Sequence, residues 1–210
     1  LEDMAIGIEC LLADDATQAQ ELANILHGIN AERRGVQQQM TDEAEAALAR
    51  LDTATEGLVP IALCLFDPDW HPGVVGLVAS KMKEKLHRPV IAFAPAEPGS
   101  STLRGSARSI PGFHIRDALA NVDSAHPGLI AKFGGHAMAA GLSLEESDLP
   151  DFQAAFRQHA QAMLDPAMLQ AELLSDGELC ASEFDAVHAA ALRDAGPWGQ
   201  GFEEPLFDGE

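Results

Sequence analysis

The stretch VPIALCLFDPDWHPGVVGLVASKMKEKLHRPVIAFA, residues 59–94, decides the fold class of this chain. Its two ends, residues 59–66 and 89–94, are short and almost continuously apolar, which is typical of strands buried on both faces of a sheet. Between them, residues 73–86 repeat apolar side chains at the spacing of one helix face. A strand, a helix and a second strand in this order predict an α/β domain with at least one parallel pair of strands.

Further elements of the same domain follow along the chain. Small and polar residues alternate over residues 103–110, which predicts a third strand, and residues 114–122 predict a short helix. The glycine pair at 134–135 interrupts the backbone before an extended run at 137–144. Residues 148–164 then have the apolar spacing of an amphipathic helix.

The chain before this domain contains two elements. Residues 4–12 are a short apolar run, for which we predict a strand. Residues 14–51 carry a single apolar stripe at helical spacing, and the acidic pair Asp14 and Asp15 suits the start of a helix. Gly28 and Gly35 weaken the middle of this helix and allow a kink there. Such a long helix with one apolar face is typical of a connector that packs along a neighbouring domain.

The pattern changes again after the Asp-Pro pair at 165–166. We predict a strand over residues 169–179 and a helix over residues 182–193, with Ser182 as its N-cap and Asp185 three residues later. Residues 196–201 form a turn-rich loop.

Charge is distributed unevenly along the 210 residues. The whole chain has a formal charge of −20, but residues 71–140 contain eight basic and four acidic residues, together with five of the eight histidines. A positive segment in an acidic protein is where an anionic ligand would bind. The alternative is a set of solvated helix faces, which is what we expect for Lys81, Lys83 and Lys85.

Several classes of protein are excluded by composition. Apolar runs such as residues 59–66 are too short to cross a bilayer, and no secretory signal is present. Cys10, Cys64 and Cys180 are far apart in sequence, which excludes zinc-knuckle and thioredoxin-like motifs and argues for a reducing cytoplasm. Because the first residue is Leu1, we expect the chain to be a piece of a longer protein.

One candidate binding segment lies in the predicted third strand. Alternate residues of a strand face the same way, so Arg104, Ser106 and Arg108 would share one face. Two guanidinium groups and a hydroxyl on one surface suit a phosphate or a carboxylate. The alternative is a surface strand whose arginines pair with the protein's own carboxylates.

Two other segments have features that suit an anion. Gly134 and Gly135 permit positive φ angles and expose backbone N–H groups, and the neighbouring His136 can donate a hydrogen bond or carry a proton; the alternative is a plain glycine turn. His71 and Trp70 immediately precede a predicted helix, whose N-terminus favours anions. The Trp70 ring would stack on a base or, as such rings do more often, lie in the core.

No local signature of catalytic chemistry is present. The histidines are scattered, and no carboxylates have the spacing of metal ligands. Ser106 and Ser109 are not part of a Gly-x-Ser-x-Gly nucleophile motif.

Taken together, five stretches resemble the C-terminal half of RecJ-type single-stranded-DNA-specific exonucleases, which belong to the DHH phosphoesterase superfamily. Gly-Gly-His followed by Ala-Ala-Gly is shared across the superfamily, whereas the Gly-Ser-Ala-Arg-Ser and Pro-Trp-Gly stretches are more particular to the RecJ type. The five run in the family's order over most of the chain: NAERR at 30–34, WHPGVVGLVAS at 70–80, RGSARS at 104–109, GGHAMAAG at 134–141 and PWGQGF at 197–202.

The resemblance implies four parts. Residues 1–13 would end the catalytic DHH domain, and residues 14–54 would be a long helical connector. Residues 55–164 would form the DHH-associated domain, with a mixed sheet flanked by helices, and residues 165–210 would be the approach to or start of an OB-fold domain. The family's metal-binding aspartates and Asp-His-His motif belong to the catalytic domain and are absent here. We therefore expect this chain to bind substrate and to be inactive alone, with Mn²⁺ or Mg²⁺ held by the missing domain of the full-length enzyme.

The resemblance also assigns residues to the substrate. Ser106 and Arg108 would hold phosphate oxygens, and Gly134, Gly135 and His136 would line the cleft that faces the metal centre. Three further residues are candidates for contact with DNA: Arg104, His71 and Arg33.

The reaction implied for the whole enzyme is metal-assisted attack of water on a phosphodiester, which releases mononucleotides from a 5′ end during DNA repair and recombination. The expected partners are single-stranded DNA, the catalytic domain of the same polypeptide and other repair proteins, with no membrane. Two alternatives stay open: a relative in the superfamily that hydrolyses oligonucleotides or cyclic dinucleotides, and a non-catalytic interaction module.

Overall fold

The computed structural model describes residues 4–54, 60–199 and 201–208, with side chains described for all of these except residues 47–54. The chain divides into two compact units, one up to Gln170 and one from Ala171 onwards. Each unit is considered by itself. No helix in the described part of the chain combines the length and the apolar character needed to cross a membrane.

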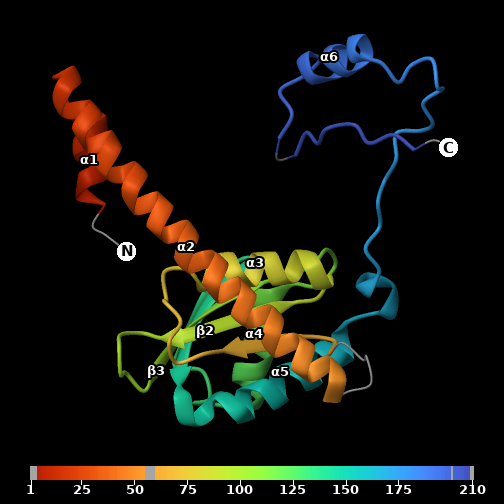
Figure 1. Ribbon diagram of the computed structural model, residues 1–210. Coiled ribbons are helices and arrows are strands. Elements are labelled where there is room, and N and C mark those ends of the chain that lie inside the picture. The colour runs from red at the N-terminus through yellow and green to blue at the C-terminus, as the bar shows by residue number, and fades with distance from the viewer. Residues whose placement is uncertain (1–3, 55–59, 200, 209–210) are drawn as a thin grey trace. The chain divides into compact units, whose positions relative to one another are not determined.

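A five-stranded mixed sheet forms the centre of the first unit (Figure 1). Its strands lie in the order β1-β2-β3-β5-β4, with β1 and β2 parallel and the other pairs antiparallel. The predicted parallel pair and the mixed sheet are therefore confirmed. The strands have these bounds: β1 Leu63–Phe66, β2 Val90–Pro95, β3 Thr102–Arg108, β4 Lys132–Gly135 and β5 Ala139–Glu145.

Helices cover the two faces of the sheet to different extents. On one face, α4 (Ile115–Ala125) and α5 (Leu149–Met163) pack on β2, β3 and β5. On the other, α3 (Val75–Leu86) packs on β2 and β3, and its apolar cluster also contains Leu63 and Leu65 of β1. All residues of β2 are buried. Side chains of β3 and β5 alternate between buried and accessible, because α4 and α5 cover one face of both strands, whereas α3 covers only part of the other face of β3. One half of the sheet thus has an open face.

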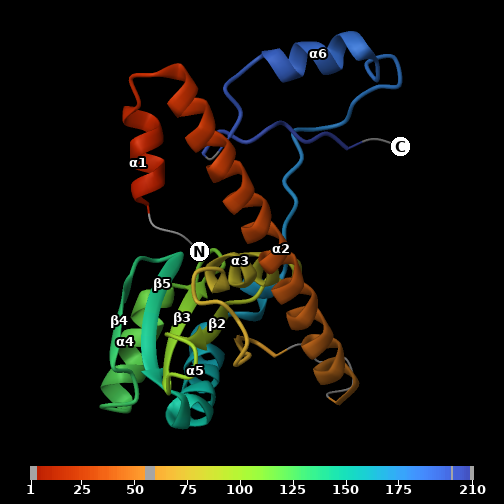
Figure 2. The same ribbon diagram turned by 60° about the vertical axis from the view of Figure 1, so that its left-hand side comes forward.

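The long helix predicted over residues 14–51 is present as α2 (Ala16–Ala54), and its role as a connector stays a prediction. The Asp15 carboxylate accepts the Gln18 N–H at 3.1 Å near its start, and the helix runs without a break through Gly28 and Gly35. The strand predicted over residues 4–12 is wrong, because Ala5–Leu12 form a helix, α1. This run has no neighbouring strand to pair with; instead it lies beside α2, as Figure 2 shows.

The connector is attached to the α/β domain through α3. Met40 and Ala44 are buried in the same apolar cluster as the α3 side chains. The Trp70 indole N–H donates to a Glu43 carboxylate oxygen at 2.9 Å, and the Trp70 side chain is only 5% exposed. Trp70 is therefore a core residue, and the stacking role considered for it is wrong.

The C-terminal unit differs from its prediction in two places. Residues 169–179 do not form a strand: Pro166–Leu169 form a short 3-10 helix, η2, and the segment beyond it has only an isolated bridge between Glu178 and Asp208. The last helix, α6, spans Ala186–Asp194 rather than 182–193. Its N-cap is Asp185, whose carboxylate accepts two backbone N–H groups at 2.8 Å, and not Ser182.

Gly105 is a position in β3 where the fold requires glycine. A Cβ added there would lie 2.5 Å from Phe93 Cε1 and 2.7 Å from Leu142 Cδ2. Neither neighbour can withdraw without disturbing the packed core, so Gly105→Val should lower the free energy of unfolding by about 1–3 kcal/mol. Urea denaturation followed by circular dichroism measures this. Gly35→Ala is the control, since its Cβ would meet nothing within 4 Å and its midpoint should not fall; equal midpoints for both variants would contradict the packing argument.

Candidate functional site

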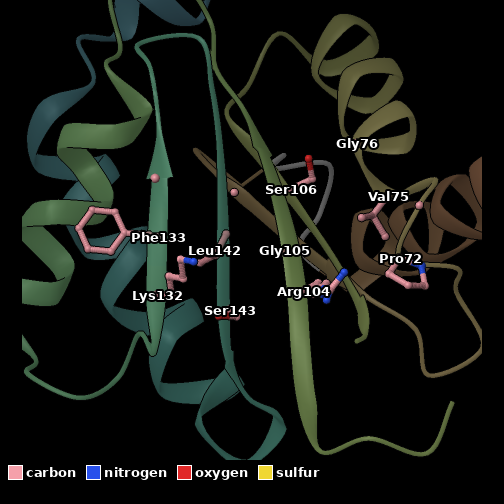
Figure 3. A pocket seen from close by; sticks show the side chains of 13 residues that line it. Pro72, Val75, Gly76, Arg104, Gly105, Ser106, Lys132, Phe133, Leu142 and Ser143 are labelled. Atoms are coloured by element: carbon pink, nitrogen blue, oxygen red, sulfur yellow. The ribbon is translucent and has the colours of Figure 1, made fainter. Parts of the chain in front are cut away.

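An open groove of about 630 Å³ lies on the uncovered half of the sheet (Figure 3). One side is the beginning of α3, with Pro72, Gly73, Val75 and Gly76. The rest is formed by nine residues of three strands, which are Arg104, Gly105, Ser106, Lys132, Phe133, Gly134, Gly141, Leu142 and Ser143. The groove exists because α3 covers β2 and part of β3 but leaves β5 and β4 uncovered.

Strand register arranges the groove side chains in two rows. Arg104 of β3 lies opposite Ser143 of β5, which lies opposite Lys132 of β4. The parallel row contains Ser106, Gly141 and Gly134, two residues along each strand. Since neighbouring strands are about 4.8 Å apart, each row spans roughly 10 Å across the sheet.

The positive charges of the groove are not neutralised by the protein. Arg104 and Lys132 are exposed, and neither forms an ion pair or a hydrogen bond within the described residues. Glu145 lies two residues after Ser143 on β5. Its carboxylate accepts hydrogen bonds from the Ser101 and Thr102 hydroxyls, each at 2.9 Å, and forms an ion pair with neither cation. Within the described residues the β3 arginines therefore do not pair with carboxylates, and Arg104 and Lys132 are free to interact with an anion.

Arg108 connects β3 to α3. Its guanidinium donates to the Ser80 hydroxyl at 3.1 Å, the Ser106 hydroxyl at 3.0 Å and the Ala107 carbonyl at 2.9 Å. Burial lowers the pKa of this guanidinium from its usual value. A Cβ added at Gly76 would be 2.9 Å from its Nη2 atom, so glycine lets the helix approach the arginine. Arg108 shares a strand face with Arg104 and Ser106, as predicted, but lies outside the lining of the groove.

Ser106 and the start of α3 place hydrogen-bond donors at the groove. The Ser106 hydroxyl oxygen accepts from Arg108, which leaves its own proton free to donate. Val74 caps α3 without a side-chain hydrogen bond, so the first N–H groups of the helix are not satisfied by a capping side chain. This end of the helix carries the positive pole of the helix dipole and faces the Ser106 side chain.

The glycine–histidine segment forms the end of β4 and the turn into β5. Gly134 lines the groove, and Gly135 has a φ of +146°, where an added Cβ would overlap the Ala139 carbonyl. The His136 N–H donates to that same carbonyl oxygen at 2.8 Å, and the His136 side chain is exposed at the turn. Gly135 is thus required by the hairpin, whereas Gly134 belongs to the groove.

The other two predicted residues, His71 and Arg33, do not line the groove. The His71 Nδ1 atom accepts the Gly73 N–H at 3.0 Å, which shapes the turn before α3 next to the lining residues Pro72 and Gly73. Arg33 lies on α2 and donates to the side chains of Asn30 and Gln37. The structure does not bring it to the groove.

Sequence reasoning missed Lys132, Gly141 and Ser143 as site residues, because it did not predict β4. One feature of the sequence could have predicted this hairpin. Lys132 and Gly134 are two residues apart on one side of a turn, and Gly141 and Ser143 are two residues apart on the other side. In an antiparallel hairpin these two pairs face each other.

The described residues offer no metal site. No group of three or more His, Cys, Asp or Glu side chains among them is placed to hold a metal ion. The groove is lined by two cations, two hydroxyls, glycines and apolar side chains, and it has no carboxylate to balance the charge of a divalent cation. Its chemistry suits an anion.

These features are those of a known domain, and the chain belongs to the DHHA1 domain family, whose model matches residues 58–162. Over 209 residues it is 52% identical to the single-stranded-DNA-specific exonuclease RecJ of Salmonella typhimurium and 51% identical to that of Escherichia coli. All of this chain but only 36% of each relative is covered, so the chain spans about a third of their length.

The fold agrees with a solved relative. The crystal structure of RecJ from Thermus thermophilus in complex with Mg²⁺ matches with a TM-score of 0.74 and 29% sequence identity, over 97% of this chain and 29% of that one. The resemblance inferred from the five motifs is thereby confirmed.

The contacts of Arg108 predict a structural effect that can be measured. Arg108→Ala removes the bonds that join β3 to α3 and should lower the free energy of unfolding by about 1–2 kcal/mol. Arg116→Ala is the matched control, because Arg116 is exposed on α4 and approaches only Asp117, at 3.8 Å. Equal urea midpoints for the two variants would show that Arg108 does not brace the helix.

Proposed function

We propose that the groove binds the phosphate backbone of single-stranded DNA, as the substrate-binding part of a 5′-to-3′ exonuclease that acts in DNA repair and recombination. The observation that carries this proposal is a pair of exposed cations, Arg104 and Lys132, that line one groove without an acidic partner among the described residues. The relatives that match the whole chain are named single-stranded-DNA-specific exonucleases, which supports the choice of ligand.

Ser106 and Arg108 act together in this proposal. Arg108 donates to the Ser106 oxygen, so the hydroxyl proton is directed to another acceptor, and a phosphate oxygen in the groove is such an acceptor. Arg108 is then a positioning residue that also adds positive potential from behind the serine. The N-terminus of α3 faces the same point from the other side of the groove.

The remaining predicted residues have lesser roles. Gly134 leaves room for the strand, Gly135 holds the turn, and the exposed His136 is in reach of a ligand that leaves the groove at the end of β4. His71 shapes the turn next to the groove. Arg33 would contact DNA only beyond the groove, along the connector.

Hydrolysis itself would take place elsewhere in the longer polypeptide. A divalent metal, when bound there, would activate water for attack on the phosphodiester. Solved RecJ structures contain Mg²⁺ or Mn²⁺, and the described residues of this chain do not provide ligands for either ion. What the groove contributes is a fixed position for the phosphates, which lowers the entropy cost of placing the scissile bond.

Removing one groove cation tests the proposal. Arg104→Ala should weaken binding of a 3′-labelled oligothymidylate about 10-fold at low salt, and should reduce the slope of log K against log salt by about 0.7. Arg116→Ala removes the same charge from the α4 side and should leave both quantities unchanged. Fluorescence anisotropy over a salt series measures the affinity and its salt dependence. Equal losses of affinity in the two variants would mean that only the net charge of the chain matters, which would contradict a specific site.

A further inference from the structure

We infer that the groove holds two successive phosphates of the strand, the second of them above Ser143 between Arg104 and Lys132. This inference rests on the proposed function and extends it to two residues, Lys132 and Ser143, with a defined place in the site. The first phosphate lies at Ser106, as proposed above.

The second position is defined by strand register. Ser143 is on β5, the strand between β3 and β4, and its two cross-strand neighbours are the cations Arg104 and Lys132. In Figure 3, Lys132 leans toward β5 from one side, while the Arg104 guanidinium lies on the other side of β3, toward Pro72. Neither cation is held by a hydrogen bond within the described residues, so each can turn toward an anion above the serine.

The hydroxyl of Ser143 is also available. It takes part in no hydrogen bond in the described part of the chain, although its backbone carbonyl accepts the Ala131 N–H at 2.9 Å. The closest acidic residue along β5 is Glu145, and its two carboxylate oxygens accept hydroxyl protons from Ser101 and Thr102. The Ser143 hydroxyl and the Lys132 ammonium group can therefore donate to an anion above Ser143, and the Arg104 guanidinium joins them once its side chain turns back across β3.

The distance between the two positions suits a nucleic-acid backbone. Ser106 of β3 lies opposite Gly141 of β5, which is two residues from Ser143, so the two serines are diagonal neighbours on adjacent strands, about 7–8 Å apart. Successive phosphates of an extended single strand are separated by about the same distance. Beside Ser106 in the first row, Gly141 adds no side chain to the groove floor: a Cβ added there would be 3.9 Å from the nearest atom, the Gly105 carbonyl oxygen. A strand can thus cross from β3 to β5 with one phosphate over each serine.

This arrangement recognises a phosphate spacing and not a single anion. A ligand with two successive phosphates can occupy both positions, whereas a mononucleotide occupies one. The groove would then select an oligonucleotide over a mononucleotide, which also favours release of a mononucleotide product.

The experiment is a coupling measurement between protein and DNA. Oligothymidylates that each carry one neutral methylphosphonate linkage, at successive places from the 5′ end, are bound to the wild-type chain and to Ser106→Ala, Lys132→Ala and Ser143→Ala. We expect Lys132→Ala to weaken binding of the unmodified strand about 10-fold. On the strand whose neutral linkage is the phosphate that Lys132 contacts, Lys132→Ala should weaken binding no further, because the charge that the lysine binds is already absent.

The positions of these linkages decide the inference. Lys132→Ala and Ser143→Ala should couple to the same linkage, and Ser106→Ala to the linkage next to it. The inference is overturned if Lys132 couples to no single linkage or to the linkage that couples to Ser106, while the proposed function stands as long as Arg104→Ala still weakens binding. If none of these four variants changes binding, the proposed function itself fails. Circular dichroism confirms that each variant is folded, and Arg116→Ala serves again as the charge control.

Discussion

The antiparallel register of β3, β5 and β4 is the constraint on which the rest of the site depends. It places Arg104, Ser143 and Lys132 in one row. Along the chain, the helix α4 lies between Arg104 and Lys132, and the turn between β4 and β5 lies between Lys132 and Ser143. If β5 shifted by one residue against its neighbours, Ser143 would face the core and the buried leucines of β5 would face the groove. This shift is prevented because Leu142 and Leu144, on the opposite face of β5, are buried against α4 and α5.

The open face depends in turn on where α3 lies. The parallel connection from β1 to β2 puts this helix on one half of the sheet, and Arg108 joins it to β3 through the Ser80 and Ser106 hydroxyls. The same arginine therefore sets the edge of the groove and orients a donor within it. The whole chain has a formal charge of −20, so under the proposed function a groove with two unpaired cations is where a polyanion meets the least repulsion.

Local patterns in the sequence were sufficient for much of the fold. The apolar runs at 59–66 and 89–94 predicted the parallel strands, and the alternation at 103–110 placed Arg104, Ser106 and Arg108 on one face. These predictions succeed because periodicity reports directly which side of an element is buried. The failures concern long-range partners: residues 4–12 are apolar enough for a strand, but they lie next to α2 and not next to a sheet.

The candidate site was predicted only in part for the same reason. Lys132, Phe133 and two glycines do not look like a strand, and only their pairing with β5 makes them one. Without β4, nothing in the sequence relates Lys132 to Ser143. The hydrogen bonds of Arg108 to Ser80 are similarly invisible, because the two residues are 28 positions apart and meet only when α3 packs on β3.

A crystal structure of this chain with a short oligothymidylate tests the central claim most directly. We predict that the strand lies in the groove and crosses from β3 to β5, with one phosphate at the Ser106 hydroxyl and the next between the Arg104 and Lys132 side chains. A strand bound across α4 and α5, or along the groove with bases and not phosphates over the two serines, would contradict the account.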